Sequence, residues 1–134
     1  MSNALYDKGR QAFLEGSIAW LTDNIKAVLV TSSYTPSTGT DQFLSDIAGG
    51  YRVATSGNLA SKTSTSGVAD AADLTFTAVS GSAVAYVVLY KDTGTAGTSP
   101  LILIIDTATN LPVTPNGGDI TVQWDNGANK IFKL

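Results

Sequence analysis

Carboxylates are the side chains of this sequence best suited to chemistry. Ten of the eleven acidic residues are Asp, and the eleventh is Glu15. A glycosidase needs two carboxyl groups that face each other across a cleft, and here such a pair would have to come from distant positions in the chain. Most of the Asp residues stand instead in turn sequences such as Asp23-Asn24 and Asp92–Gly94, where the short side chain hydrogen-bonds its own backbone. The pattern therefore predicts turn-forming carboxylates and no catalytic residues.

Other reactive motifs are missing from the sequence as well. His and Cys are absent, which removes the common base near neutral pH and the common ligands of transition metals. Oxygen ligands occur in the segments VADAAD and WDNGAN, but neither has the spacing of a calcium-binding loop. The Gly-rich segment DTGTAGTS at 92–99 lacks the Lys-Ser/Thr ending of a phosphate-binding loop, and no Ser-x-x-Lys motif marks a nucleophile. We expect no metal ion and no cofactor.

The distribution of charge argues against two classes of partner. The formal net charge is -3, and the 8 basic residues are scattered along the chain. Nucleic-acid binding needs clustered Lys and Arg that displace counterions from phosphates, so we do not expect a nucleic-acid partner. No apolar run approaches the roughly 20 residues of a membrane helix, and the first residues lack the basic and apolar regions of a secretory signal. We expect a soluble protein made in the cytoplasm, without a membrane partner.

Residues 1–16 are the one part of the chain with a helical pattern. The apolar side chains of residues 3–15 fall roughly on one side of a helix; they are Leu5, Tyr6, Phe13 and Leu14. Gly9 weakens this assignment because glycine inside a helix costs about 1 kcal/mol relative to Ala, whereas Gly16 is a typical stop signal. We predict a short N-terminal helix or an extended arm, whose apolar side covers either the core or a partner.

Residues 17–134 have the pattern of a single β domain. Short apolar or alternating runs are separated by turn signals roughly every ten residues. The expected strands lie at 18–21, 25–31, 51–55, 74–78, 83–90 and 101–105, and the first two are expected to form a hairpin about Asp23-Asn24. A closing hairpin is expected over 119–134, with its turn at Asn126-Gly127. Because the runs 83–90 and 101–105 are almost continuously apolar, we expect these two strands to be buried on both faces.

Eight or nine short strands without β-α alternation predict an all-β fold. The expected architecture is a single-domain antiparallel β-sandwich or jelly-roll-like barrel with a short N-terminal helix or arm. The segment 92–99 then forms the tip of a hairpin at the surface. Its Thr, Ser and Gly residues would offer adaptable hydrogen bonds and close backbone approach to a neighbouring subunit.

Three parts of the chain are candidate contacts with other subunits: the N-terminal segment, the first Trp and the predicted hairpin tip. Tyr and Trp dominate the buried centres of protein interfaces, although both also pack in cores. The predicted contact residues are Tyr6, Arg10, Phe13, Trp20, Thr93, Thr95 and Thr98.

Several stretches together resemble a known family. They are NALYDKGRQAFLEGSIAWLTDNIKAVLV at the start, then FLSDI, VATSGNLASKT and GVADAADLTFTAVSG, and the C-terminal part from YKDTGTAGTSP to NKIFKL. The most specific part is PVTPNGGDI with the following VQWDNGANKIF. In these stretches, which cover essentially the whole chain, the sequence is similar to small virion structural proteins of tailed bacteriophages.

This resemblance implies a component of the virion, and in particular a capsid decoration (cement) protein that binds the assembled head. The implied partner is the major capsid protein, and the implied location is the capsid surface, after synthesis in the host cytoplasm. A homo-oligomer is expected, of which a trimer is one form. The alternatives are another particle component, such as a head–tail connector, a tail component or a host-surface adhesin. A small glycan-acting enzyme is disfavoured by the missing His and the lone Glu15.

Overall fold

The computed structural model describes residues 4–106, 111–124 and 130–133. Within these ranges the chain is mostly β, with nine strands paired antiparallel and one α-helix. In chain order the elements are β1 (Ala4–Leu5), α1 (Asp7–Leu14), β2 (Ile25–Thr31), β3 (Arg52–Thr55), β4 (Val68–Ala69), β5 (Leu74–Phe76), β6 (Val84–Lys91), β7 (Leu101–Ile105), β8 (Ile120–Val122) and β9 (Phe132–Lys133). The expectation of a β-rich chain with a short N-terminal helix is confirmed.

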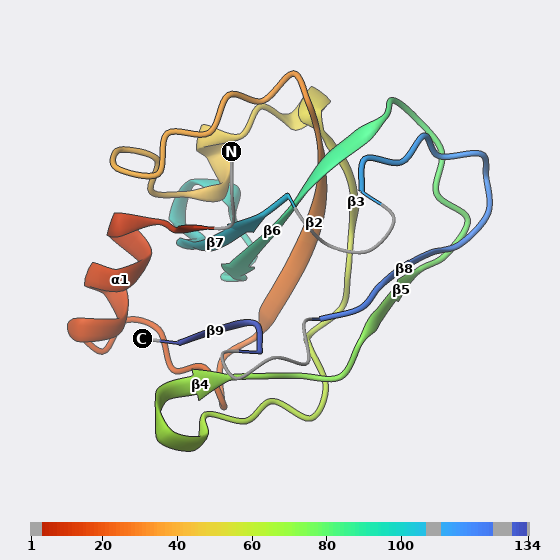
Figure 1. Cartoon of the computed structure of the whole chain (residues 1–134). Coiled ribbons are helices and arrows are strands. Elements are labelled where there is room, and N and C mark those ends of the chain that lie inside the picture. Colours follow the sequence, from red (N-terminus) through yellow and green to blue (C-terminus); the bar gives the residue numbers. More distant parts are fainter. Residues whose placement is uncertain (1–3, 107–110, 125–129, 134) are drawn as a thin grey trace.

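The centre of the molecule is a five-stranded sheet in the order β1-β7-β6-β2-β3 (Figure 1). Its longest pair is β2 with β6, which runs from Ile25 opposite Lys91 to Thr31 opposite Val84. The strands β6 and β7 pair antiparallel, and every residue of β7 is buried. The prediction that segment 92–99 is the tip of a hairpin between two buried strands is therefore confirmed.

Side chains on the two faces of this sheet enter two separate cores. In β2, Ala27 and Leu29 belong to the larger core, whereas Val28 and Val30 belong to the smaller one, because successive side chains of a strand point to opposite faces. The larger core also contains residues of α1 and of the short strands β4, β5, β8 and β9, and the smaller core contains residues from segment 34–47. Burial of both faces explains why β2, β6 and β7 have apolar runs instead of alternating patterns.

Two short ribbons complete the larger core, one of β4 with β9 and one of β5 with β8. In Figure 1, β5 and β8 lie side by side although they are far apart in the sequence. The predicted closing hairpin is therefore wrong in its pairing, since β8 and β9 join two different strands from the middle of the chain. Alternation identifies a strand but says nothing about which strand lies beside it. The predicted turn at Asn126-Gly127 lies outside the described residues.

Two other strand predictions differ from the structure. Residues 18–21 form no strand, so the predicted hairpin with 25–31 is wrong, and β2 pairs with β3 and β6 instead. The segment turns at 20–22, where the Asp23 carboxylate accepts the Ala19 N–H at 2.8 Å and the Asp23 N–H donates to the Ala19 carbonyl at 2.9 Å. The strand predicted over 74–78 ends at Phe76, and Ala78 adopts a left-handed backbone with φ of 50°. At 18–21 the side chains of Ile18 and Trp20 are buried from irregular backbone, which periodicity alone does not distinguish from a strand, whereas Ala78 is exposed.

The N-terminal segment combines a strand and a helix. β1 pairs with the edge of β7, and α1 follows it across the same strand. A Cβ atom on Gly9 would lie 2.5 Å from the carbonyl oxygen of Leu101, so the helix backbone rests directly on β7. The helix ends at the predicted stop, where Gly16 has φ of 76° and the Ser17 N–H donates to the Ala12 carbonyl at 2.8 Å; these are features of a Schellman motif.

Candidate functional site

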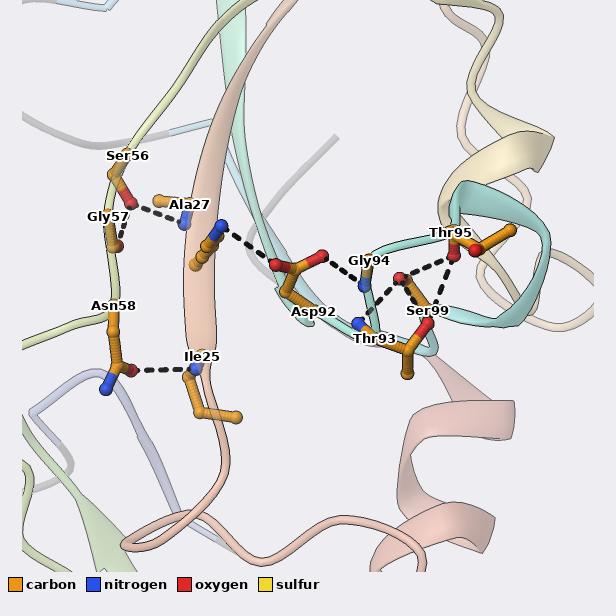
Figure 2. A network of polar contacts seen from close by, with 11 residues as sticks. Ile25, Ala27, Ser56, Gly57, Asn58, Asp92, Thr93, Gly94, Thr95 and Ser99 are labelled. Atoms are coloured by element: carbon orange, nitrogen blue, oxygen red, sulfur yellow. Dashed lines mark hydrogen bonds and ion pairs between the residues drawn. The ribbon is translucent and has the colours of Figure 1, made fainter.

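The loop between β6 and β7 is held by its own hydrogen bonds (Figure 2). The Thr93 N–H donates to Ser99 Oγ at 3.1 Å, and the Ser99 hydroxyl donates to the Thr95 carbonyl oxygen at 2.8 Å. The hydroxyl oxygens of Thr93 and Thr98 are 2.6 Å apart. Because Ser99 is fully buried, its side of these bonds is shielded from water, which favours one loop conformation.

Asp92 ties the first turn of this loop to the neighbouring strand. One of its carboxylate oxygens lies 2.8 Å from Lys26 Nζ in β2, and the other accepts the Gly94 N–H at 3.0 Å (Figure 2). The Lys26 hydrogen bond, followed by that of Gly94, holds the pKa of Asp92 below its usual value. Because both side chains of the ion pair are partly exposed, it contributes at most about 1 kcal/mol. The prediction that this carboxylate serves a turn is confirmed.

The other end of the loop is attached to segment 42–44. The Leu44 N–H donates to the Ser99 carbonyl at 2.9 Å, and the Leu101 N–H donates to the Gln42 carbonyl at 2.8 Å. The loop is therefore fixed on two sides, by Lys26 in the sheet and by the backbone of 42–44.

A second row of polar contacts in Figure 2 continues the edge of the sheet beyond β3. Ser56 Oγ accepts the Ala27 N–H, and Asn58 Oδ1 accepts the Ile25 N–H, both at 2.9 Å. These side-chain oxygens stand in for the carbonyl groups of a paired strand. Their role is to satisfy the backbone of β2, so we assign them to the fold.

An open pocket of about 280 Å³ lies between α1 and the β6–β7 loop, and we call it the polar pocket. Its walls include Lys8 and Gln11 from α1, Glu15 at the end of that helix, Phe43, and Lys91, Thr93 and Thr98 from the hairpin. The Lys91 ammonium pairs with Asp23 at 3.2 Å and donates to the Ser17 carbonyl at 2.7 Å, and the Gln11 amide donates to Glu15 at 3.0 Å. Charges of both signs, hydroxyl groups and one aromatic ring suit this pocket to hydrogen-bonding side chains of another protein.

A smaller pocket of about 180 Å³ lies on the other side of α1, and we call it the apolar pocket. Phe13, Trp20, Ala69 and Phe132 are among its lining residues. The ring of Trp20 stands edge-on to Phe132 with centroids 5.3 Å apart, and its indole N–H donates to the Thr63 carbonyl at 2.9 Å. The only polar atom of Trp20 is therefore satisfied, and what faces the pocket is hydrocarbon.

Tyr6 joins the N-terminal segment to the smaller core. Its hydroxyl lies 2.9 Å from that of Tyr34, which in turn donates to Asp41 Oδ2 at 2.6 Å. Burial raises the pKa of both Tyr6 and Tyr34 above the ordinary tyrosine value. Because the Tyr34 hydroxyl gives its proton to Asp41, Tyr6 is the donor in the first bond. The pair fastens β1 to segment 34–41.

The seven predicted contact residues are divided between the surface and the core. Four are exposed, Phe13 is half-buried at the rim of the apolar pocket, and two are buried; the exposed ones are Arg10, Thr93, Thr95 and Thr98. Tyr6 has no exposed surface and Trp20 exposes 6%, so the prediction that these two are surface contacts is wrong. Tyrosine and tryptophan side chains pack in cores as well as in interfaces. Here Trp20 lies in the larger core and Tyr6 in the smaller one.

The structure brings the N-terminal segment and the hairpin tip together at the polar pocket, which the sequence did not indicate. Thr93 and Thr98 lie on one side of it, whereas Arg10 and Thr95 do not line it. Sequence reasoning missed Lys8, Phe43 and Lys91. The polar pocket forms because β1 pairs with β7 and thereby places α1 beside the β6–β7 hairpin. No local sequence pattern predicts that pairing.

Within the described ranges, no group of three or more acidic side chains could hold a metal ion, and no helix is long and apolar enough to cross a membrane. No protein-family model matches the sequence, and the comparison with curated proteins finds no match. The residues and their arrangement are therefore the basis for the function proposed below.

Proposed function

We propose that this protein is a structural component of a tailed-bacteriophage virion that decorates and stabilises the assembled capsid. The observation that carries the proposal is the β6–β7 loop, which is held by its own hydrogen bonds and presents exposed Thr side chains beside the polar pocket. The resemblance of the sequence to small phage virion proteins gives the biological setting. The partner is the major capsid protein, and the protein acts at the capsid surface after synthesis in the host cytoplasm.

A loop that is ordered before binding suits a protein whose function is to bind the capsid surface. Ordering a loop on binding consumes part of the interaction free energy, so a loop that is already ordered binds more tightly for the same contacts. In this loop the order comes from buried Ser99 and from the Asp92–Lys26 pair. The Thr95 carbonyl oxygen accepts the hydrogen bond from Ser99, whereas the Thr95 side chain is exposed and can contact the capsid.

Decoration stabilises a capsid by binding the assembled shell in preference to its free subunits. A free concentration one hundredfold above the dissociation constant adds about 2.7 kcal/mol for each occupied site. This mechanism requires complementary surfaces and no catalytic group. In the proposed architecture, the ribbons β4–β9 and β5–β8 form the second layer of a small β-sandwich. The β6–β7 loop extends from the central sheet and contacts the capsid.

Substitution at the loop tip tests the proposed surface. Thr95→Arg places a long charged side chain on the exposed tip and leaves the hydrogen-bonded carbonyl in place, so we expect binding to capsids to fall about tenfold or more, which corresponds to about 1.4 kcal/mol. Binding is measured by co-sedimentation of purified protein with undecorated capsids of the parent phage. The matched control is Thr77→Arg, at an exposed position beyond β5, for which wild-type binding is expected.

Equal binding by both variants would remove the loop from the interface. Density for the protein at the connector, the tail or the tail tip, with none on the capsid, would favour the alternative particle roles over decoration. Turnover of a cell-wall or capsule glycan by the purified protein would replace the proposal with an enzymatic function.

A further inference from the structure

The α1 side of the polar pocket carries a lysine that has no charged partner. Lys8 lines the pocket and is half-buried, and no carboxylate of the described residues forms an ion pair with it. The second lysine of the pocket, Lys91, is already engaged, because its ammonium pairs with Asp23 at 3.2 Å and donates to the Ser17 carbonyl at 2.7 Å. Of these two lysines, Lys8 therefore keeps an ammonium group that a ligand can bind.

The residues that α1 contributes to this pocket lie on one face of the helix. Lys8, Gln11 and Glu15 are spaced by three and four residues, which places them one above another, and all three line the pocket. Lys8 and Glu15 stand about two turns apart, or about 10 Å along the helix axis. The Glu15 carboxylate accepts the Gln11 amide at 3.0 Å. It repels an anion at the Lys8 end only weakly, because salt largely screens exposed charges at that separation.

The Lys8 end of the pocket lies next to the segment that carries Phe43. The Asp7 N–H, one residue before Lys8, donates to the Thr38 carbonyl at 2.8 Å, and Phe43 forms an isolated bridge with Pro100. Phe43 and Pro100 both line the pocket, so hydrocarbon is available beside the ammonium group. The pocket volume is about 280 Å³, whereas a cavity of about 150 Å³ holds benzene. A glutamate side chain, which has fewer heavy atoms than benzene, therefore fits.

We propose that the polar pocket binds a glutamate side chain of the major capsid protein, with the carboxylate at the Lys8 ammonium and the methylene groups against Phe43. The identity of the partner rests on the function proposed above, whereas the chemistry of the ligand rests on the pocket. A partner that covers Lys8 removes water from its ammonium group, and a charge buried without a partner costs free energy. A carboxylate compensates this cost, so it binds in preference to the neutral amide of the same shape.

Titration of the free protein tests the ligand chemistry without a capsid. The probes are glutamate and glutamine with both backbone ends capped by acetyl and methylamide groups, and binding to the isotope-labelled full chain is followed by amide chemical shifts. We expect shifts around the pocket, including Gln11, Phe43 and Thr93, and an affinity at least about fivefold higher for the glutamate probe. Lys8→Gln removes this preference. The matched control is Lys133→Gln, at an exposed lysine of β9 that lines neither pocket, and it keeps the preference.

Binding to undecorated capsids tests the partner. Lys8→Glu places like charges opposite each other, so we expect binding at least about tenfold weaker than that of the wild type. Lys133→Glu changes the net charge of the protein equally and binds like the wild type.

The outcomes separate this inference from capsid decoration. Equal affinity for the two probes, or wild-type capsid binding by Lys8→Glu, would overturn the inference, and decoration would stand if Thr95→Arg still weakened binding. A wild-type protein that prefers the glutamate probe but binds no capsid would refute decoration and uphold the ligand chemistry of the pocket.

Discussion

At the scale of single residues, Ser99 holds the β6–β7 loop together. Its hydroxyl has no exposed surface and forms hydrogen bonds with the Thr93 N–H and the Thr95 carbonyl oxygen. The neighbouring Thr98 hydroxyl is exposed, and water can replace its contact with Thr93. We therefore expect the Ser99 hydroxyl to contribute more to the free energy of unfolding than the Thr98 hydroxyl.

Removing the two hydroxyls separately tests this difference. Ser99→Ala removes the hydroxyl that bonds both the Thr93 N–H and the Thr95 carbonyl oxygen, so we expect the free energy of unfolding to fall by about 1–2 kcal/mol. Thr98→Ala is the control and should change it by no more than about 0.5 kcal/mol. Both values come from urea unfolding followed by tryptophan fluorescence. A Ser99→Ala protein as stable as the control would mean that the loop does not depend on this network.

The sequence indicated which residues were suited to contacts, but only in part which of them reach the surface. The small polar residues Thr93, Thr95 and Thr98 were expected at a hairpin tip, and they are exposed there. Tyr6 and Trp20 were expected to be available to a partner, yet each buries its ring and uses its one polar group inside the fold. An aromatic side chain with one polar atom fits both environments, so residue type alone cannot separate them.

At the scale of elements, the close approach of α1 to β7 depends on Gly9. Local sequence does not explain a glycine inside this helix, because glycine weakens helices by about 1 kcal/mol relative to Ala. In the fold, a Cβ at this position would meet the backbone of β7, 2.5 Å from the Leu101 oxygen and 3.0 Å from Ile102 Cα. Glycine is required by the packing of α1 against the sheet.

Gly9→Ala should therefore destabilise the protein despite the higher helix propensity of Ala. We expect a net loss of about 1–3 kcal/mol, because backbone atoms cannot move aside as a side chain can. Gly57→Ala is the matched control, since no atom lies within 4 Å of its added Cβ and its φ is not left-handed. Thermal unfolding of the two variants compares them, and a Gly9→Ala protein more stable than the wild type would contradict the packing.

The β6–β7 hairpin was predictable, whereas the hairpin expected between the neighbouring segments 18–21 and 25–31 is absent and the pairings of distant strands were not foreseen. Two apolar runs around a Gly-rich centre identified the β6–β7 hairpin, because its partners adjoin along the chain. β8 and β9 pair with β5 and β4 across long stretches of sequence, and the alternation of Ile120 and Val122 does not encode that choice. The same limit applies to the polar pocket, which depends on the pairing of β1 with β7.

At the scale of the whole molecule, one helix separates two different surfaces. On one side of α1 is the polar pocket with the fixed β6–β7 loop, and on the other side is the apolar pocket, which Phe13 lines. The proposed capsid-binding role belongs to the polar side, where the β domain holds the β6–β7 loop beside α1.

The most direct test of capsid decoration compares binding to assembled shells with binding to their unassembled subunits. Labelled protein is titrated against undecorated capsids and, separately, against dissociated major capsid protein, and bound protein is counted in each case. Decoration predicts saturable binding to the shells at a fixed number of copies per subunit, much weaker binding to free subunits, and shells that withstand heating better when decorated. Equal affinity for shells and subunits, or no binding to shells, would contradict it.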